Sequence, residues 1–226
     1  MPVVLVTSAS RGIGLAFARH YAGADWTVLA ACRDPVAATD LQAVAGDVRP
    51  LAMDVTSEAS VEAAAAADDA PVDLVINSAG VIGDTQDGPG RVDYARWAET
   101  LDVNAMGPVR VLDAFADRLA ASEIRLAVTI TSGMGSLADA GSGMALMYRT
   151  SKAAVNMAMR ARAFDLRPRG ITVVVINPGW VRTDMGGPGA TLSAEDSVAA
   201  MRRVFDTLTL EQSGRFFNYT GAEYPW

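Results

Sequence analysis

Short apolar runs alternate with longer amphipathic stretches along the chain. The short runs are rich in β-branched residues and most are apolar on both faces, which is typical of parallel strands that helices cover on each side. They lie at 3–7, 26–31, 49–55, 72–77, 126–132 and 171–178, and residues 214–219 are an expected edge strand. The longer stretches predict helices at 12–22, 57–67, 93–120, 146–167 and 194–208.

The order of these elements predicts the fold class. Strand and helix alternate throughout, so successive parallel strands are joined by right-handed crossovers. We therefore expect an α/β fold, a single doubly wound (Rossmann) parallel sheet of about seven strands flanked by helices on both faces. No internal repeat, linker or block of charge interrupts the pattern, so residues 1–226 are expected to form one domain.

Composition and charge exclude several classes of protein. With 19 basic and 26 acidic residues the net charge is -7, which makes nucleic acid and anionic lipid poor partners. The opening MPVVLVTSAS has no basic segment before its apolar run, and no apolar stretch approaches the roughly 18 residues of a membrane span. One cysteine and one histidine, His20, provide no metal site. A cytoplasmic protein without membrane or nucleic-acid partners is expected.

The loop TSASRGIG (7–14) follows the first expected strand and opens the first helix. Without side chains at Gly12 and Gly14, a pyrophosphate can approach the backbone amides, and the helix N-terminus favours its negative charge. The same glycines also suit a tight turn that holds no ligand, so both interpretations stay open at this point. Ser8 stands where glycine would turn most freely, and it strains the loop only if its φ is positive.

The end of the second expected strand indicates which nucleotide the loop would hold. NAD-binding sheets usually place an acidic residue there, which accepts a hydrogen bond from the ribose 2′-hydroxyl. This chain has Arg33 instead, and Arg11 lies in the glycine loop. Two guanidinium groups would bind a 2′-phosphate through charge-assisted hydrogen bonds, which favours NADP(H). NAD(H) stays open, because either arginine can be a solvated surface charge and Asp34 can neutralise Arg33.

Candidate acid–base chemistry lies at Tyr148 and Lys152, which are four residues apart and so share one face of a helix. A free phenol titrates near pH ~10, and a neighbouring ammonium is expected to lower its pKa toward the working range. Ser132 ends the fifth expected strand at the same edge of the sheet, where its hydroxyl would hydrogen-bond a carbonyl oxygen. A tyrosine and a lysine at this spacing are common by chance, so the inference depends on their position beside a nucleotide-binding edge.

Six regions of the chain, taken in order, resemble the short-chain dehydrogenase/reductase family over essentially the whole length. They are TSASRGIG (7–14), MDVT (53–56), NSAG (77–80), LDVNAMGP (101–108), ITS (130–132) with YRTSK (148–152), and NPGWVRTDM (177–185). Ser8 and Ser78 depart from the family pattern, which has glycine and asparagine at these positions. Within the family, SRGIG, ACRDP, GWVRTDMGG and YPW resemble the C-factor-like and sniffer-like carbonyl reductase branch.

This resemblance implies an NADP(H)-dependent carbonyl reductase or alcohol dehydrogenase that acts on a small molecule. In that family Tyr148 would protonate the carbonyl oxygen, and Lys152 would bind the nicotinamide ribose and lower the pKa of the phenol. Ser132 would orient the carbonyl, and Asn104 would hold a water in a proton relay. The implied cofactor-binding residues are Ser8, Ser10, Arg11, Gly12, Ile13, Gly14, Arg33, Asp54, Val55, Asn77, Ala79, Gly80, Tyr148, Lys152, Pro178, Gly179, Val181 and Thr183.

The resemblance leaves the substrate and the assembly open. The interval from Ser132 to Tyr148 is a few residues longer than the family's usual spacing, which would reshape the wall of the substrate pocket. Counterparts of the helices at 93–120 and 146–167 often pack across subunit interfaces in this family, so a homodimer or homotetramer is expected. Burial of the same faces within one subunit would explain their apolar residues equally well.

A second function, from another class, is a nucleotide-binding signalling or regulatory protein of the same fold with little turnover. The complete set of four catalytic residues argues against it, because a protein that only binds has no need of them. Ser8 argues mildly for it, since a weakened cofactor loop would matter less to such a protein.

Overall fold

The computed structural model describes residues 1–83 and 92–226. Within them, seven parallel strands form one sheet in the order β3-β2-β1-β4-β5-β6-β7. The strands are β1 (Val3–Thr7), β2 (Thr27–Cys32), β3 (Val48–Ala52), β4 (Leu74–Asn77), β5 (Leu126–Ile130), β6 (Thr172–Asn177) and β7 (Phe216–Asn218). The described helices are α1 (Gly12–Ala22), α2 (Thr39–Gln42), α3 (Glu58–Ala65), α4 (Tyr94–Leu101), α5 (Gly107–Ala120), α6 (Leu146–Leu166) and α7 (Ala194–Phe205). The predicted doubly wound α/β sheet is confirmed.

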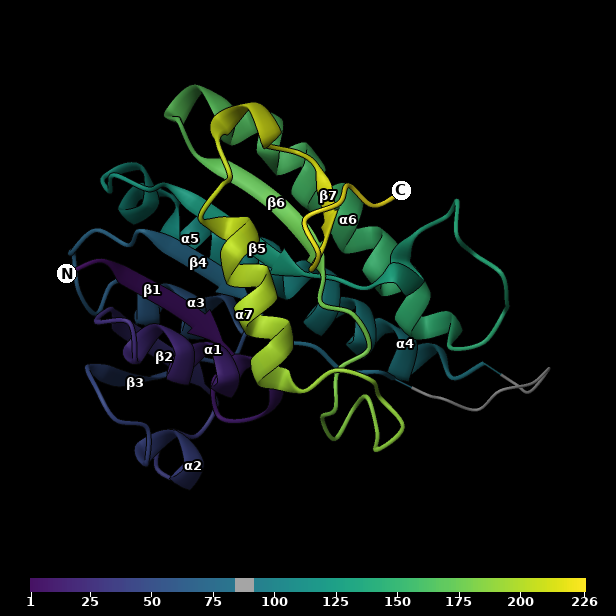
Figure 1. Cartoon of the computed structure of the whole chain (residues 1–226), viewed down its shortest axis with the longest axis horizontal. Coiled ribbons are helices and arrows are strands. Elements are labelled where there is room, and N and C mark those ends of the chain that lie inside the picture. The colour runs from purple at the N-terminus through teal and green to yellow at the C-terminus, as the bar shows by residue number, and fades with distance from the viewer. Residues whose placement is uncertain (84–91) are drawn as a thin grey trace.

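Helices cover both faces of this sheet, and the alternation of side chains along each strand explains why (Figure 1). Val4 and Val6 pack into a core under α1 and α7, whereas Leu5 points to the opposite core under α3, α5 and α6. All three are fully buried, and burial of one such side chain stabilises the fold by about 1.5–3 kcal/mol. The central strands are therefore buried on both faces and mostly apolar, as their sequence indicates.

Two of the differences between the expected elements and the structure have clear local causes. The predicted strand 49–55 ends at Ala52 because the carboxylate of Asp54 accepts hydrogen bonds from the amide (2.9 Å) and hydroxyl (2.7 Å) of Thr56, which forms a turn. The predicted helix 93–120 is divided into α4 and α5 by a π-helical turn at Asp102–Met106. Single π turns inside helices are frequent at functional sites, and this one carries Asn104.

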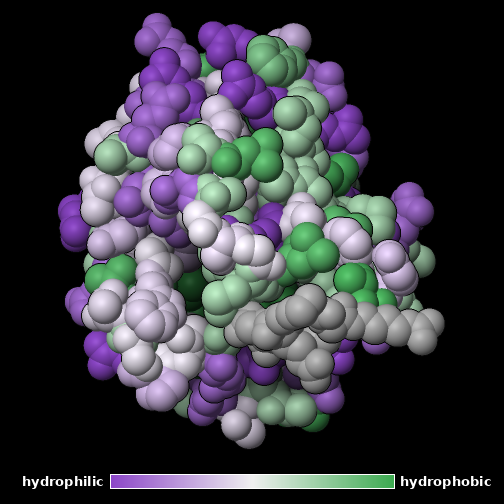
Figure 2. Space-filling model, turned by 90° about the vertical axis from the view of Figure 1, so that its right-hand side faces the viewer, coloured by the Kyte–Doolittle hydropathy of each residue, from purple (hydrophilic) through white to green (hydrophobic). Residues whose placement is uncertain are grey.

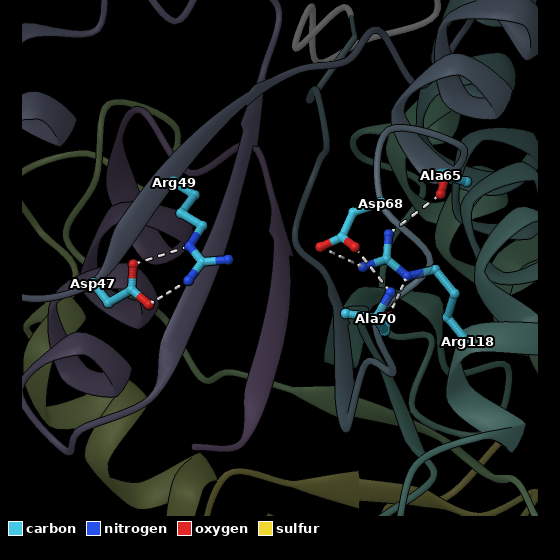
Figure 3. Close-up of polar contacts among 6 residues, drawn as sticks. All are labelled: Asp47, Arg49, Ala65, Asp68, Ala70 and Arg118. Atoms are coloured by element: carbon cyan, nitrogen blue, oxygen red, sulfur yellow. Dashed lines mark hydrogen bonds and ion pairs between the residues drawn. The ribbon is translucent and has the colours of Figure 1, made fainter.

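Arg118 joins α5 to its neighbour α3 in the same layer and to the loop that follows α3. Its side chain is buried and donates hydrogen bonds to the carbonyl oxygens of Ala70 (2.7 Å) and Ala65 (3.3 Å) at the end of α3 (Figure 3). Burial lowers the pKa of this guanidinium, and Asp68, 3.9 Å away, opposes that change. Figure 3 also shows the exposed Asp47–Arg49 pair on β3 and the segment before it, where water screens both charges.

The strand order reverses between β1 and β4, which are neighbours in the sheet with a crossover on each side. Thr7 Oγ1, at the end of β1, accepts hydrogen bonds from the amides of Ser78 (2.9 Å) and Ala79 (3.1 Å), which follow β4. In doubly wound sheets, ligands bind beyond the carboxyl ends of the strands at such a switch point. The candidate site is therefore expected at this edge.

Candidate active site

The glycine loop at the end of β1 is held by a left-handed residue at Ser8, whose φ is 56°. This conformation turns the Ser8 carbonyl onto Gly14, where an added Cβ would lie 2.2 Å from the carbonyl oxygen. Gly14 is therefore required by the path of the loop. The sequence predicted strain at Ser8 if its φ were positive, and that condition is met. A non-glycine residue in the left-handed backbone region costs about 1–2 kcal/mol.

The N-terminus of α1 is open to an anion. Arg11, which precedes the helix, has extended backbone and provides no side-chain cap, and the first turn contains no acidic residue. The first amides of a helix have no partner within it, so they can donate to phosphate oxygens. Gly12 faces Thr183, and an added Cβ would lie 3.4 Å from the threonine methyl group. These residues form a cradle that fits a pyrophosphate.

The two arginines expected to bind a 2′-phosphate are both exposed. Arg11 forms a loose ion pair of 3.8 Å with Asp184 on the far side of the site. Arg33 forms no ion pair or side-chain hydrogen bond within residues 1–83 and 92–226, although its charge helps to lower the pKa of Asp54. Asp34 turns away to cap its own loop, where its carboxylate accepts from the amides of Val36 and Ala37. Arg33 is not neutralised by Asp34.

Tyr148, Lys152 and Ser132 come together at the same edge. Lys152 is buried on α6, where its Nζ donates to the carbonyl oxygen of Ile130 at 2.9 Å and lies 5.6 Å from the centre of the Tyr148 ring. Ser132 follows β5, and its Oγ accepts a hydrogen bond from the amide of Met134 at 3.1 Å, which orients the hydroxyl. The predicted grouping of these three side chains is thus reproduced by the fold.

The electrostatics of this group differ from the expectation for the phenol. Burial raises the pKa of Tyr148, and the neighbouring Ser132 hydroxyl lowers it only in part. Burial also lowers the pKa of Lys152 to about 8, because its ammonium is removed from water without a carboxylate partner. The Tyr148 pKa is therefore raised where the sequence predicted a lowering, because the effect of burial outweighs that of its polar neighbours.

Asn104 is fully buried in the π-helical turn between α4 and α5. Its amide donates to the carbonyl oxygen of Val81 (2.7 Å) and to Ser151 Oγ (2.9 Å), and its Oδ1 accepts from the Val81 amide (2.8 Å). Both side-chain hydrogens are therefore used within the protein. Asn104 therefore has no side-chain donor left for the expected water, and its contacts with Val81 fix the segment after Gly80.

The other predicted cofactor residues lie around this edge with separate roles in the fold. Asn77 Nδ2 donates to the Pro108 carbonyl at 3.3 Å, whereas its buried Oδ1 has no hydrogen-bond partner among the described residues. The Pro178 carbonyl accepts from Ser197 at 2.7 Å, and Val181 pairs with Leu192. These bonds place the segment after β6 beside the glycine loop.

A cavity of about 370 Å³ runs along this edge. Figure 2 looks onto this side of the molecule, where apolar residues gather around a hollow. The predicted residues that line the cavity are Ser8, Arg11, Gly12, Ile13, Gly14, Gly80, Tyr148, Lys152, Pro178 and Thr183. The predicted residues outside its lining are Ser10, Arg33, Asp54, Val55, Asn77, Ala79, Asn104, Ser132, Gly179 and Val181.

Two of the residues near the site that the sequence did not single out are Arg96 and Tyr224. Arg96, on the first turn of α4, lines the cavity. Tyr224 packs behind Ser132, since a Cβ on Gly133 would lie 2.6 Å from the Tyr224 hydroxyl, which donates to Asp139 at 2.8 Å. The position of Arg96 at the start of the helix after β4 is a sequence feature that could have placed it near the site. No residue close to Tyr224 in the sequence indicates its contact with Gly133.

The family model for short chain dehydrogenase matches residues 2–191. C-signal of Myxococcus xanthus is 53% identical over 156 residues, which cover 69% of this chain and 93% of that protein. The 1-hydroxy-2-glutathionyl-2-methyl-3-butene dehydrogenase of Rhodococcus sp. is 35% identical over the full length of both chains (100% of each).

Solved structures of carbonyl reductases have the same fold. The NADPH-bound carbonyl reductase from chicken fatty liver superposes with a TM-score of 0.92 at 33% identity and covers 100% of both chains. The carbonyl reductase Sniffer of D. melanogaster has a TM-score of 0.92 at 26% identity, also over 100% of both chains. These matches confirm the resemblance to the sniffer-like branch. Of the helices in the described ranges, not one combines the length and apolar character needed to cross a membrane.

Proposed function

Because the chain belongs to the short-chain dehydrogenase family, we propose that it interconverts a carbonyl compound and an alcohol, with Tyr148 as the acid–base catalyst. The observation that carries this proposal is the position of Tyr148 on the wall of a cavity that continues to the glycine loop. Ser132 lies beside the phenol, and the Lys152 ammonium lies 5.6 Å from its ring.

NADP(H) is the preferred cofactor, which the likeness to NADPH- and NADP-bound carbonyl reductase structures supports. The cradle of Ser8, Gly12 and Gly14 would hold the pyrophosphate against the N-terminus of α1. Arg11 and Arg33 would bind the 2′-phosphate, and the remaining predicted residues would bind the adenine and nicotinamide ends. NAD(H) remains an alternative cofactor to be compared with NADPH by direct titration. When bound, NADPH supplies the hydride for carbonyl reduction.

The residues of the chain then have distinct tasks. The raised pKa keeps the Tyr148 phenol protonated at neutral pH, so it can donate its proton to the carbonyl oxygen during reduction. Ser132 would hydrogen-bond the same oxygen and fix its position. Lys152 would bind the ribose of the cofactor, which would replace the Ile130 carbonyl as a partner of Nζ. Asn104 would hold the backbone at Val81 in the shape that the cofactor needs.

A second function is favoured by one specific observation. The chain is 53% identical to C-signal of Myxococcus xanthus, a name that denotes a signalling role for that protein. A nucleotide-binding regulatory protein with little turnover would use the same cradle and would not depend on proton transfer by Tyr148. Turnover therefore distinguishes the two functions.

The test combines binding and catalysis. NADPH and NADH fluorescence is followed on titration with the protein, and oxidation of the preferred nucleotide is then measured with aldehydes, ketones and quinones. Tyr148→Phe is expected to bind NADPH normally and to lose on the order of 10²–10⁴-fold in rate. Tyr94→Phe, an exposed position on α4, is the matched control. Tight NADPH binding without turnover on any carbonyl would favour the regulatory function.

The assembly and domain organisation are also proposals. Residues 1–226 are proposed to form one domain, and this domain to associate as a homodimer or homotetramer. Met157 and Phe164, seven residues apart on α6, are 67% and 69% exposed and supply apolar surface for such an interface. Light scattering of the purified protein tests this, because a monomer at micromolar concentration would exclude a stable dimer.

A further inference from the structure

The cavity is positively charged in a chain of negative net charge. Among residues 1–83 and 92–226, the charged residues that line it are Arg11, Arg96, Lys152 and Asp184, that is, three cations against one anion, whereas the whole chain carries a net charge of -7. An acidic protein repels anionic small molecules at a distance, so cations gathered in one cavity favour an anionic occupant there. The phosphates of the cofactor account for part of this charge.

Two of the three cations already have partners or tasks. Arg11 belongs to the glycine loop, where a phosphate is expected, and pairs loosely with Asp184. Lys152 is buried and donates to the Ile130 carbonyl beneath the phenol of Tyr148. Arg96 differs from both, because its guanidinium forms no hydrogen bond or ion pair with any residue that the structure describes. Neither the cofactor cradle nor the proton transfer uses it.

The packing of α4 on α6 places Arg96 on the wall of the cavity. Thr100, one helical turn further on and therefore on the same face, is buried, and its Oγ1 donates to the Arg96 carbonyl at 2.8 Å. That face packs on Gly83, where an added Cβ would lie 2.8 Å from Thr100 Oγ1 and 3.2 Å from Cβ of Met147. Met147 directly precedes Tyr148 on α6, and the neighbouring Trp97 on α4 donates to Thr150 Oγ1 on α6 at 2.8 Å. Arg96 and Tyr148 therefore line one cavity from two helices that pack on each other.

We propose that Arg96 binds a carboxylate of the substrate, so that the preferred substrates are carbonyl compounds or alcohols bearing an acidic group. This inference rests on the proposed function, since it assigns the substrate class of the same site. A guanidinium presents its donors in a planar fork that matches the two oxygens of a carboxylate. Arg96 is itself exposed, so added salt should weaken this pair.

The experiment uses two aldehydes that differ in charge and have nearly the same shape. The full-length protein with NADPH is assayed on 4-formylbenzoate and on its uncharged methyl ester. Wild type is expected to have a kcat/KM about tenfold higher for the acid, mainly through KM, as one charge-assisted contact implies. Arg96→Gln should abolish this preference and leave the ester unchanged, whereas Arg96→Lys should retain part of it.

The control and the salt dependence exclude a general effect of charge. Arg203→Gln removes the same charge from an exposed position on α7, outside the lining of the cavity, and should keep the preference for the acid. Rising salt should reduce the preference of wild type and not that of Arg96→Gln. Equal preference in wild type and Arg96→Gln, with both aldehydes reduced, would overturn the role of Arg96 and leave the proposed function intact. Reduction of neither aldehyde nor any other carbonyl would overturn both.

Discussion

Ser8 is strained by its own side chain, and removing that side chain should make the protein more stable. Its φ of 56° costs a non-glycine residue about 1–2 kcal/mol, and the hydroxyl forms no hydrogen bond with the described residues that would offset this. Glycine adds about 0.4–1 kcal/mol of chain entropy to the unfolded state. Ser8→Gly is therefore expected to raise the free energy of unfolding by about 0.5–1 kcal/mol, or about 1–4 °C in Tm for a chain of this size.

The assay is urea unfolding at neutral pH, with Tm as the second readout. Ser10→Gly is the matched control, because Ser10 lies in the same loop with no positive φ, and it should lose about 0.4–1 kcal/mol. Ser8→Ala should stay close to wild type, because alanine keeps the Cβ that causes the strain. A Ser8→Gly protein destabilised as much as Ser10→Gly would refute the reasoning. NADPH affinity should not change, since the loop backbone already has the conformation that glycine adopts.

Three further predictions concern charge. Arg33→Ala should weaken NADPH binding about tenfold or more and leave NADH binding unchanged; an unchanged ratio of the two dissociation constants would place Arg33 outside the site. Arg118→Ala leaves the Ala65 and Ala70 carbonyls without their donor and should cost about 3 kcal/mol in urea unfolding, far more than Arg49→Ala at the exposed pair. Lys152 has a pKa of about 8 when folded and 10.5 when unfolded, so the unfolded state binds its proton more tightly and the stability should rise with pH across that window. Between pH 7.5 and 9.5 the gain relative to Lys152→Met should be about 2 kcal/mol, and parallel pH profiles for the two proteins would contradict the lowered pKa.

The sequence by itself determined the architecture and the main chemical groups of the site. Strands buried on both faces are mostly apolar, and this pattern can be seen within each strand without knowledge of its neighbours. The glycines at 12 and 14 follow the first strand directly, and Tyr148 and Lys152 share a helical face through their spacing alone. Each of these features depends on residues within a few positions of one another.

Only the tertiary structure decided the features that depend on distant segments. The sign of φ at Ser8 follows from the fit of its carbonyl against Gly14 and of Thr7 against the amides after β4. The π-helical turn at Asn104 is held by Val81 and Ser151, which belong to other elements. No local periodicity could indicate these contacts.

The electrostatics and the pocket wall depend on the same long-range contacts. The pKa of Lys152 is lowered because β5 and α6 bury it against the Ile130 carbonyl, and Arg96 reaches the cavity because α4 packs on Gly83. Tyr224 supports Gly133 from a position 91 residues away along the chain. A pKa and a cavity lining are set by all the groups that the fold brings within a few ångströms, so they exist only once the chain has closed on itself.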